Sequence, residues 1–159
     1  MAYIGHMVRP TFEYKGQPVK AAGLLVWTEI DGQRWTLFRK YKGKWSDLGG
    51  KTSANDTTIL DTVVREVCEE TNHGLFAADD TDCASKVRDI LECARGNRIY
   101  YDKKCKYVLF VCRVDPALFA LPMSRFGRAE GQHAHAYQWH ATRPAKLHFR
   151  LRGVKRMLF

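Results

Sequence analysis

Hydrophobic and polar positions in the first third of the chain follow the pattern of a β-hairpin. Residues 21–29 form a nearly continuous apolar run, and residues 34–41 alternate more clearly between apolar and polar side chains. Asp31-Gly32 lies between the two runs and is a typical signal for a tight turn between antiparallel strands. We therefore expect a hairpin over residues 21–41.

The hydrophobic period changes from two to about 3.6 residues beyond the paired glycines at 49 and 50. Apolar side chains recur there at three- and four-residue spacing, at Ile59, Leu60, Val63, Val64 and Val67. This pattern predicts a helix over residues 57–71. Asp56 precedes the helix and is expected to cap its first turn.

The rest of the chain predicts a weaker helix over residues 85–95 and strands over 99–101, 106–114 and 136–141. Apolar residues at helical spacing predict a final helix over residues 147–158. This order of elements is typical of an α+β fold in which a mixed sheet lies between helices. The chain has no Pro- or Ser-rich linker, so we expect one domain over residues 1–159.

Three glutamates share one face of the predicted helix at 57–71. Relative to Glu66, a helix rotates Glu70 by about 40° and Glu69 by about −60°. Ile59 and Val63 fall in the same sector, so the glutamates continue an apolar stripe. Glutamate is rarely buried without a partner. The spacing alone fits equally a site for a hard cation, Mg²⁺ or Mn²⁺, and a solvated acidic face.

These residues also carry a resemblance to a known family. The run Gly49-Gly50, followed after a loop by Arg65-Glu66-Val67-Cys68-Glu69-Glu70, resembles the box motif of the Nudix hydrolases. That motif has the pattern G-x5-E-x7-R-E-U-x-E-E-x-G-U, in which U is an apolar residue. The R-E-U-x-E-E half matches at every specified position. The resemblance implies the mixed-sheet fold of that family.

The first half of the motif departs from the pattern. The spacing from Gly50 to Arg65 is one residue longer than the motif has, so the loop carries an insertion. The first glutamate of the motif should fall at Thr57, which has no charge. Asp56 is one candidate replacement after a shifted gap. Asp61 is another, since it lies four residues before Arg65 on the helix and could hold that side chain in place.

The resemblance implies a chemistry for the matched residues. Nudix enzymes hydrolyse a diphosphate linkage in compounds of the type nucleoside diphosphate–X. By the resemblance, Glu66, Glu69 and Glu70 are metal ligands, and the carbonyl of Gly49 is a further ligand. Arg65 would orient Glu66, which is also a candidate for catalysis. The implied cofactor is Mg²⁺, with Mn²⁺ as an alternative.

The family often adds an acid from a later loop. Glu130 lies shortly before the strand predicted at 136–141 and is our candidate for this catalytic acid. Asp102 and Asp115 are alternatives, and an ordinary solvated loop acid explains Glu130 equally well.

The charge of the chain narrows the partners that we expect. Twenty-six Lys and Arg oppose 17 Asp and Glu, which gives a net charge of +9 and a pI near 9.5. Such a balance favours polyanionic partners. Basic and aromatic side chains alternate beside the expected site, a mixture that suits phosphate clamping and base stacking. The expected substrate-binding residues are Arg39, Lys40, Lys44, Trp45 and Lys51.

Composition excludes other classes of protein. The chain is 45% hydrophobic, which argues against a disordered protein, and no apolar stretch approaches the ~20 residues of a membrane span. No secretory signal is visible at the start of the chain. Five cysteines without a C-x-x-C pair fit reduced thiols, so we expect a cytoplasmic protein without a membrane partner.

Two hypotheses of function follow. The first is a Mg²⁺-dependent hydrolase of phosphoanhydride bonds in a nucleotide-type substrate. A capped RNA end or a dinucleoside polyphosphate would suit the positive charge. The alternative is a non-catalytic module of Nudix fold that binds RNA or nucleotide, which the missing glutamate at Thr57 favours. Retention of three mutually repelling glutamates favours the enzyme.

Overall fold

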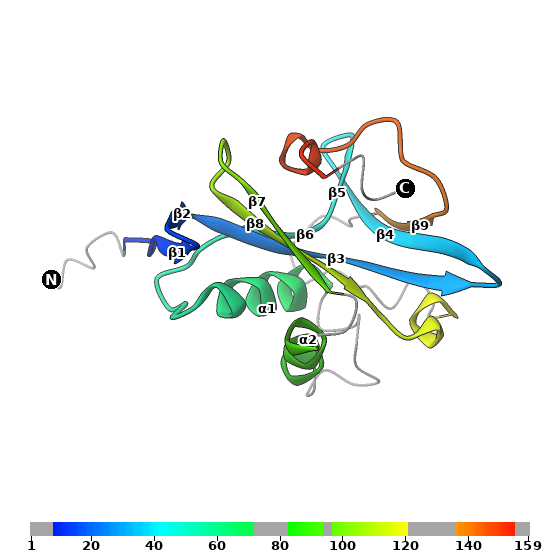
Figure 1. Ribbon diagram of the computed structural model, residues 1–159, viewed down its shortest axis with the longest axis horizontal. Helices are drawn as coiled ribbons and strands as arrows, with labels where there is room; N and C mark the ends of the chain where they lie inside the picture. The colour runs from blue at the N-terminus through cyan, green and yellow to red at the C-terminus, as the bar shows by residue number, and fades with distance from the viewer. Residues whose placement is uncertain (1–7, 72–82, 94–96, 121–135, 155–159) are drawn as a thin grey trace, which may run out of the picture.

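The computed structural model describes residues 8–71, 83–93, 97–120 and 136–154. In chain order the elements are β1 (Phe12–Tyr14), β2 (Gln17–Val19), β3 (Ala21–Ile30), β4 (Gln33–Tyr41), β5 (Lys44–Ser46), β6 (Leu48–Lys51), α1 (Ile59–Glu70), α2 (Cys83–Glu92), β7 (Arg98–Asp102), β8 (Tyr107–Arg113) and β9 (Ala136–His140). Two 3₁₀ turns add η1 (Pro116–Ala120) and η3 (Phe149–Leu151). Figure 1 shows these elements along the chain.

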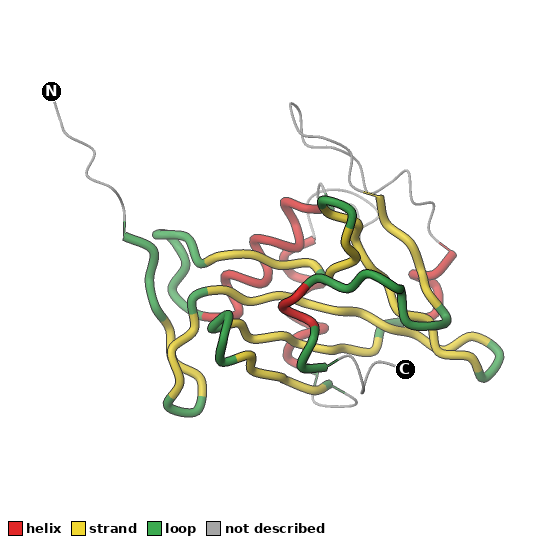
Figure 2. The backbone as a smooth tube through the Cα atoms, turned by 90° about the horizontal axis from the view of Figure 1, so that it is seen from above, coloured by secondary structure: helices red, strands yellow, loops and turns green. Residues whose placement is uncertain are grey.

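The main sheet is mixed, and its strands run in the order β5-β4-β3-β8-β7. The central pair, β3 and β8, is parallel, whereas β4, β6 and β7 pair with their neighbours in antiparallel fashion. The long strand β3 pairs with β6 along its first half and with β4 along its second half. The short β1–β2 hairpin lies at one end of the main sheet (Figure 2).

The predicted hairpin is confirmed as β3 and β4. Asp31 and Gly32 form its two-residue turn with φ of 50° and 77°, the left-handed conformation that a type I′ turn requires at both positions. Lys42 and Gly43 adopt the same pair of angles, 49° and 78°, and join β4 to β5. A Lys-Gly pair therefore makes a second hairpin, which was not predicted from the sequence.

The predicted helix at 57–71 is confirmed as α1, but its expected cap is wrong. Thr58, not Asp56, is the N-cap, and its hydroxyl accepts a hydrogen bond from the Asp61 N–H at 3.1 Å. The Asp61 carboxylate accepts the Thr58 N–H in return at 3.1 Å, which completes a capping box. Asp56 points elsewhere, because it binds the side chain of Arg65.

Two layers of apolar side chains cover the two faces of the sheet, which confirms the predicted α+β class. One layer packs α1 and α2 against the sheet, with Val63, Val67 and Val87 fully buried. The other packs the C-terminal segment, through Leu151 and Val154, against the opposite face. Figure 1 shows α1 and α2 on one side of the sheet and the C-terminal turn on the other.

The C-terminal segment does not form the helix expected over 147–158. Its described part, residues 147–154, contains the short turn η3, and residues 155–158 lie outside the described ranges. The backbone of this segment pairs instead with β5. Trp45 N–H donates to the Lys146 carbonyl at 2.7 Å, and His148 N–H donates to the Trp45 carbonyl at 2.8 Å. The Lys146 carbonyl, which would accept the first hydrogen bond of a helix from residue 147, is thereby engaged with β5.

None of the described helices is both long and apolar enough to cross a membrane. Cys68, Cys93, Cys105 and Cys112 are free thiols, and Cys68 and Cys112 lie in the core.

Candidate active site

A pocket of about 380 Å³ opens where the C-terminal half of α1 meets β6, the end of β4 and the C-terminal segment. Its lining contains carboxylates from the helix, cations from three other segments and the backbone of β6. The lining residues are Arg39, Tyr41, Ser46, Gly49, Gly50, Lys51, Glu66, Glu69, Glu70, His148 and Arg150. All three glutamates that the sequence singled out therefore face one cavity.

The burial of these glutamates agrees with their angular positions around the predicted helix. Val63 is fully buried, and the side chains of Glu66 and Glu70 on the same stripe are only 16% and 11% exposed. Glu69, at the edge of the sector, is 54% exposed. Burial raises the pKa of the Glu66 carboxyl, and the neighbouring Arg65 acts in the opposite direction.

The side chain of Glu70 is the least exposed of the three glutamates. Its Oε2 accepts the Gly49 N–H at 3.0 Å, and its Oε1 pairs with Arg39 Nη2 at 3.0 Å. Burial raises the pKa of Glu70 to about 8, while the positive charge of Arg39 acts to lower it. The pair joins the end of α1 to the end of β4.

Arg65 connects the helix to the loop before it. Nη1 donates to Glu66 Oε1 at 2.9 Å and to Glu69 Oε2 at 3.4 Å, while Nη2 donates to the Lys51 carbonyl at 2.8 Å. Nε and Nη2 bind both oxygens of Asp56 at 3.1 Å. The side chain thus holds Glu66 from one side.

Of the two candidate replacements for the missing glutamate, Asp56 is the one that holds Arg65. It is 7% exposed and also accepts hydrogen bonds from Ser53 N–H and the Thr62 hydroxyl, both at 2.8 Å. Burial acts to raise the pKa of Asp56, but these hydrogen bonds, with the one from Arg65 foremost, lower it overall. Asp61 caps α1 and pairs with Arg88 instead.

The paired glycines are required by close approach of neighbouring groups. A Cβ on Gly49 would lie 2.5 Å from the Ala22 carbonyl oxygen and 2.5 Å from the Gly23 Cα, both backbone atoms. A Cβ on Gly50 would lie 2.6 Å from the carboxyl carbon of Glu66. The first glycine therefore lets β6 lie against β3, and the second leaves room for the carboxylate of Glu66.

A buried network on the opposite wall was not predicted from the sequence. Asp47 is fully buried and accepts hydrogen bonds from Arg150 Nε at 2.7 Å, from the Ser46 hydroxyl at 2.9 Å and from the Tyr107 hydroxyl. Arg150 Nη2 also donates to the Gly49 carbonyl at 3.4 Å. Asp47 was the available signal, since an acid between the strand residues Ser46 and Leu48 is unlikely to be buried without a cation.

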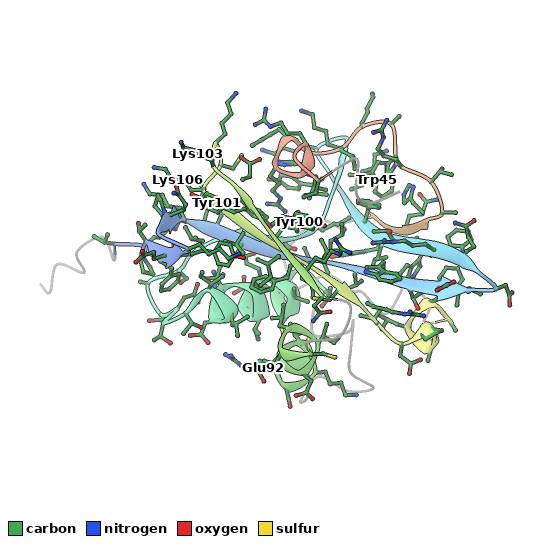
Figure 3. All side chains as sticks on the ribbon, viewed as in Figure 1. Trp45, Glu92, Tyr100, Tyr101, Lys103 and Lys106 are labelled. Carbon is green, nitrogen blue, oxygen red and sulfur yellow. The ribbon has the colours of Figure 1, made fainter. Side chains whose placement is uncertain are left out.

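The expected substrate-binding residues divide into two groups. Arg39 and Lys51 line the pocket, whereas Lys40, Lys44 and Trp45 are absent from its lining. Trp45 packs beside the C-terminal segment on the sheet face opposite α1 (Figure 3). The Nζ atom of Lys40 lies 5.7 Å from the centroid of the Trp45 ring. Glu130 lies outside the described residues, and Asp102 caps the turn after β7 through the N–H groups of Lys104 and Cys105.

The fit of a metal ion depends on donor chemistry and on arrangement. The carboxylate oxygens of Glu66, Glu69 and Glu70 are donors of the kind that Mg²⁺ takes, and they share one pocket. Within the described ranges, however, no three Asp, Glu, His or Cys side chains are already grouped for a metal. Arg39 and Arg65 pair with these carboxylates instead. The donor set fits the ion, and its grouping requires the arginine contacts to rearrange.

Comparison with known proteins gives structural matches of low similarity only. No protein-family model matches the chain, and no curated protein matches it. The crystal structure of a C. elegans Ap4A hydrolase is 19% identical, with a TM-score of 0.40 over 76% of this chain and 78% of that chain. A binary complex of a C. elegans Ap4A hydrolase gives 19% and 0.37 over the same shares.

The NUDIX domain of Shewanella oneidensis NrtR, complexed with ADP ribose, is 16% identical, with a TM-score of 0.40 over 79% of this chain and 73% of that chain. Similarity at this level identifies no activity or ligand for this chain.

Proposed function

We propose that this chain hydrolyses phosphoanhydride bonds in nucleotide-linked compounds and uses Mg²⁺, or Mn²⁺, as its cofactor. One observation carries the proposal: a single pocket joins three glutamates from one helix to the cations Arg39, Lys51 and Arg150. A diphosphate is itself anionic, so its hydrolysis needs cations to bind the phosphates and carboxylates to hold a metal ion or accept a proton.

The glutamates have distinct surroundings that suit distinct roles. Glu66, Glu69 and Glu70 would hold the ion, with the Gly49 carbonyl as a further donor. When bound, Mg²⁺ neutralises phosphate charge and lowers the pKa of a bound water. Glu66 is held by Arg65 and faces the space that Gly50 leaves open, so it is also our candidate for the group that accepts the proton.

The cations of the pocket would bind the phosphate oxygens. Arg150 is fixed by Asp47 through Nε, and this leaves its partly exposed guanidinium facing the pocket. A guanidinium held in this way loses little conformational freedom when it binds a phosphate. Lys51 is exposed at the rim and supplies a mobile point charge.

A non-catalytic module that binds nucleotide or RNA is the second candidate. The observation in its favour is that Arg39 and Arg65 already pair with the three glutamates. A binder would keep these pairs, whereas the hydrolase exchanges them for the metal ion.

Release of products from a panel of compounds separates the two candidates. Capped RNA, dinucleoside polyphosphates and nucleoside triphosphates are incubated with Mg²⁺ and either wild type or Glu69→Gln. We expect products from the wild type and a rate at least about 100-fold lower from the variant. Equal product from both proteins would overturn the catalytic proposal, and binding without product from either would establish the module.

Other expectations stand as proposals beside this one. They are a single domain over residues 1–159, a cytoplasmic location, an acid role for Glu130 and contacts of Lys40, Lys44 and Trp45 with substrate.

A further inference from the structure

A second cavity lies directly beside the site. It has a volume of about 310 Å³, close to that of the first pocket, and both volumes lie in the range of small-molecule sites. Its lining residues are Arg143, Pro144, Ala145, Leu147, His148 and Arg152. His148 also lines the first pocket, so the two cavities meet at this side chain.

The second cavity has a positive charge that the fold does not use. Arg143 and Arg152 both line it, and its lining contains no acidic residue. Both arginines are exposed, and within the described part of the chain neither forms an ion pair with a carboxylate. The guanidinium carbon of Arg152 lies 5.9 Å from the centroid of the Phe149 ring. Two unneutralised guanidinium groups in one concave lining favour a bound anion.

The wall between the two cavities is fixed to the sheet. Residues 146–148 bind both backbone groups of Trp45, at 2.7 and 2.8 Å, and Leu147 forms a bridge beside it. The side chain of Leu147 packs in the same apolar layer as Trp45. Because β5 holds this segment, the second cavity keeps a constant place relative to the glutamates.

His148 provides a hydrogen-bond donor at the junction. Its Nδ1 accepts the Arg150 N–H at 3.2 Å, so in the neutral ring the proton lies on Nε2. Burial and the nearby charge of Arg150 lower the pKa of His148, which keeps the ring neutral near pH 7. The ring lies against that of Phe149, tilted by 32° with centroids 4.2 Å apart, and this contact restricts its rotation.

We propose that this cavity is a second anion-binding subsite, which takes the far phosphate-bearing half of a two-ended polyphosphate such as a dinucleoside polyphosphate. The inference rests on the proposed function, because it assigns the far half of the substrate whose phosphoanhydride lies at the glutamates. A one-ended compound such as a nucleoside triphosphate fills the first pocket and leaves Arg143 and Arg152 without a ligand.

The test compares two substrates across three proteins. Wild type, Arg143→Ala/Arg152→Ala and the control Arg98→Ala, whose exposed arginine lies on the far edge strand β7, are assayed with a dinucleoside tetraphosphate and a nucleoside triphosphate in Mg²⁺. We expect the double variant to raise KM for the dinucleotide about tenfold and to leave kcat unchanged. A tenfold change is the size expected when at least one charge-assisted hydrogen bond to the substrate is lost. In the double variant, KM for the triphosphate should stay within about twofold of the wild-type value. In Arg98→Ala, KM for each of the two substrates should also stay within about twofold of the wild-type value.

Equal effects of the double variant on the two substrates, or no effect on either, would overturn the subsite while leaving the hydrolase intact. If the wild type hydrolyses neither compound, calorimetric titration of the same proteins with the dinucleotide decides. Binding that weakens about tenfold in the double variant supports the subsite without the activity, and absent or unchanged binding overturns it. Binding of a capped RNA oligonucleotide but not of the dinucleotide would also overturn it. The single variant Arg143→Ala repeats the test if the double variant fails to fold.

Discussion

Arg39 and Glu70 form a nearly buried ion pair at the base of the pocket, with 3.0 Å between Nη2 and Oε1 and side-chain exposures of 8% and 11%. The pair joins the end of β4 to the last turn of α1. On the same turn, the Tyr137 hydroxyl donates to the Glu70 carbonyl from β9. The charge of Arg39 therefore contributes both to the stability of the fold and to the electrostatics of the site.

Removal of the positive charge at position 39 should destabilise the protein. In Arg39→Met the stem is kept, but Glu70 loses its ion-pair partner and keeps only the charge of Arg150 nearby, and the loss of one partner of a buried pair costs about 3 kcal/mol. Urea denaturation at pH 9, above the raised pKa of Glu70, measures this loss. Lys40→Met is the matched control, because Lys40 is exposed and should change the free energy of unfolding by less than about 0.5 kcal/mol. Equal stabilities of the two variants would contradict the role of the pair.

The two glycines of β6 should respond differently to a single methyl group. In Gly50→Ala the new Cβ meets the flexible end of Glu66, so the carboxylate is displaced and hydrolysis should fall at least about 100-fold while the fold persists. In Gly49→Ala the Cβ meets backbone atoms of β3 that cannot move aside, so the protein itself should unfold more readily. Thermal melting and activity are measured on both variants. Full activity in Gly50→Ala would exclude the proposed position of Glu66.

The cap of α1 should contribute measurably to stability. Thr58→Ala removes the hydroxyl that accepts the Asp61 N–H, and such a loss costs about 1 kcal/mol. Urea denaturation compares this variant with Ser85→Ala, which changes an exposed side chain on α2 and should alter stability by less than about 0.5 kcal/mol. An unchanged free energy of unfolding in Thr58→Ala would assign the cap to another residue.

Stability should fall in acid partly through Asp61. Hydrogen bonds from Thr57 and Arg88 hold the pKa of Asp61 well below its usual range in the folded protein. In the unfolded chain the Asp61 carboxyl has a pKa of about 3.9, so it binds a proton at a higher pH than in the folded protein. The stabilisation is therefore present above about pH 5 and is lost as the pH falls. The stability difference between wild type and Asp61→Asn should therefore shrink between about pH 5 and pH 3. A difference that is constant over this range would contradict the mechanism.

The sequence predicted those features that depend on local pattern. Alternation and an Asp-Gly turn gave β3 and β4, and helical spacing gave α1 with its glutamates on a partly buried stripe. These features depend on residues close in the chain, so their periods are visible without knowledge of the fold.

Features that depend on distant contacts were missed. Asp56 was expected to cap α1, but Arg65, nine residues away, binds it instead. Residues 147–154 have a helical pattern, yet their backbone pairs with β5, about 100 residues earlier in the chain. Arg150 falls within the helix predicted at 147–158, whereas in the structure it binds Asp47 and lines the pocket. No local period encodes these pairings.

The dependence of the hydrolysis rate on Mg²⁺ concentration tests the central claim most directly, with wild type and Glu66→Gln measured side by side on a dinucleoside polyphosphate. For the wild type we predict no turnover in the presence of a chelator and a rate that rises to saturation as Mg²⁺ is added. For Glu66→Gln the half-saturating Mg²⁺ concentration should rise at least about tenfold. Loss of a residue that only supports a metal ligand lowers metal affinity about 10- to 100-fold, and loss of a ligand itself should lower it at least as much. Turnover that persists in chelator, or one Mg²⁺ curve shared by both proteins, would contradict the assignment of the glutamates as metal ligands.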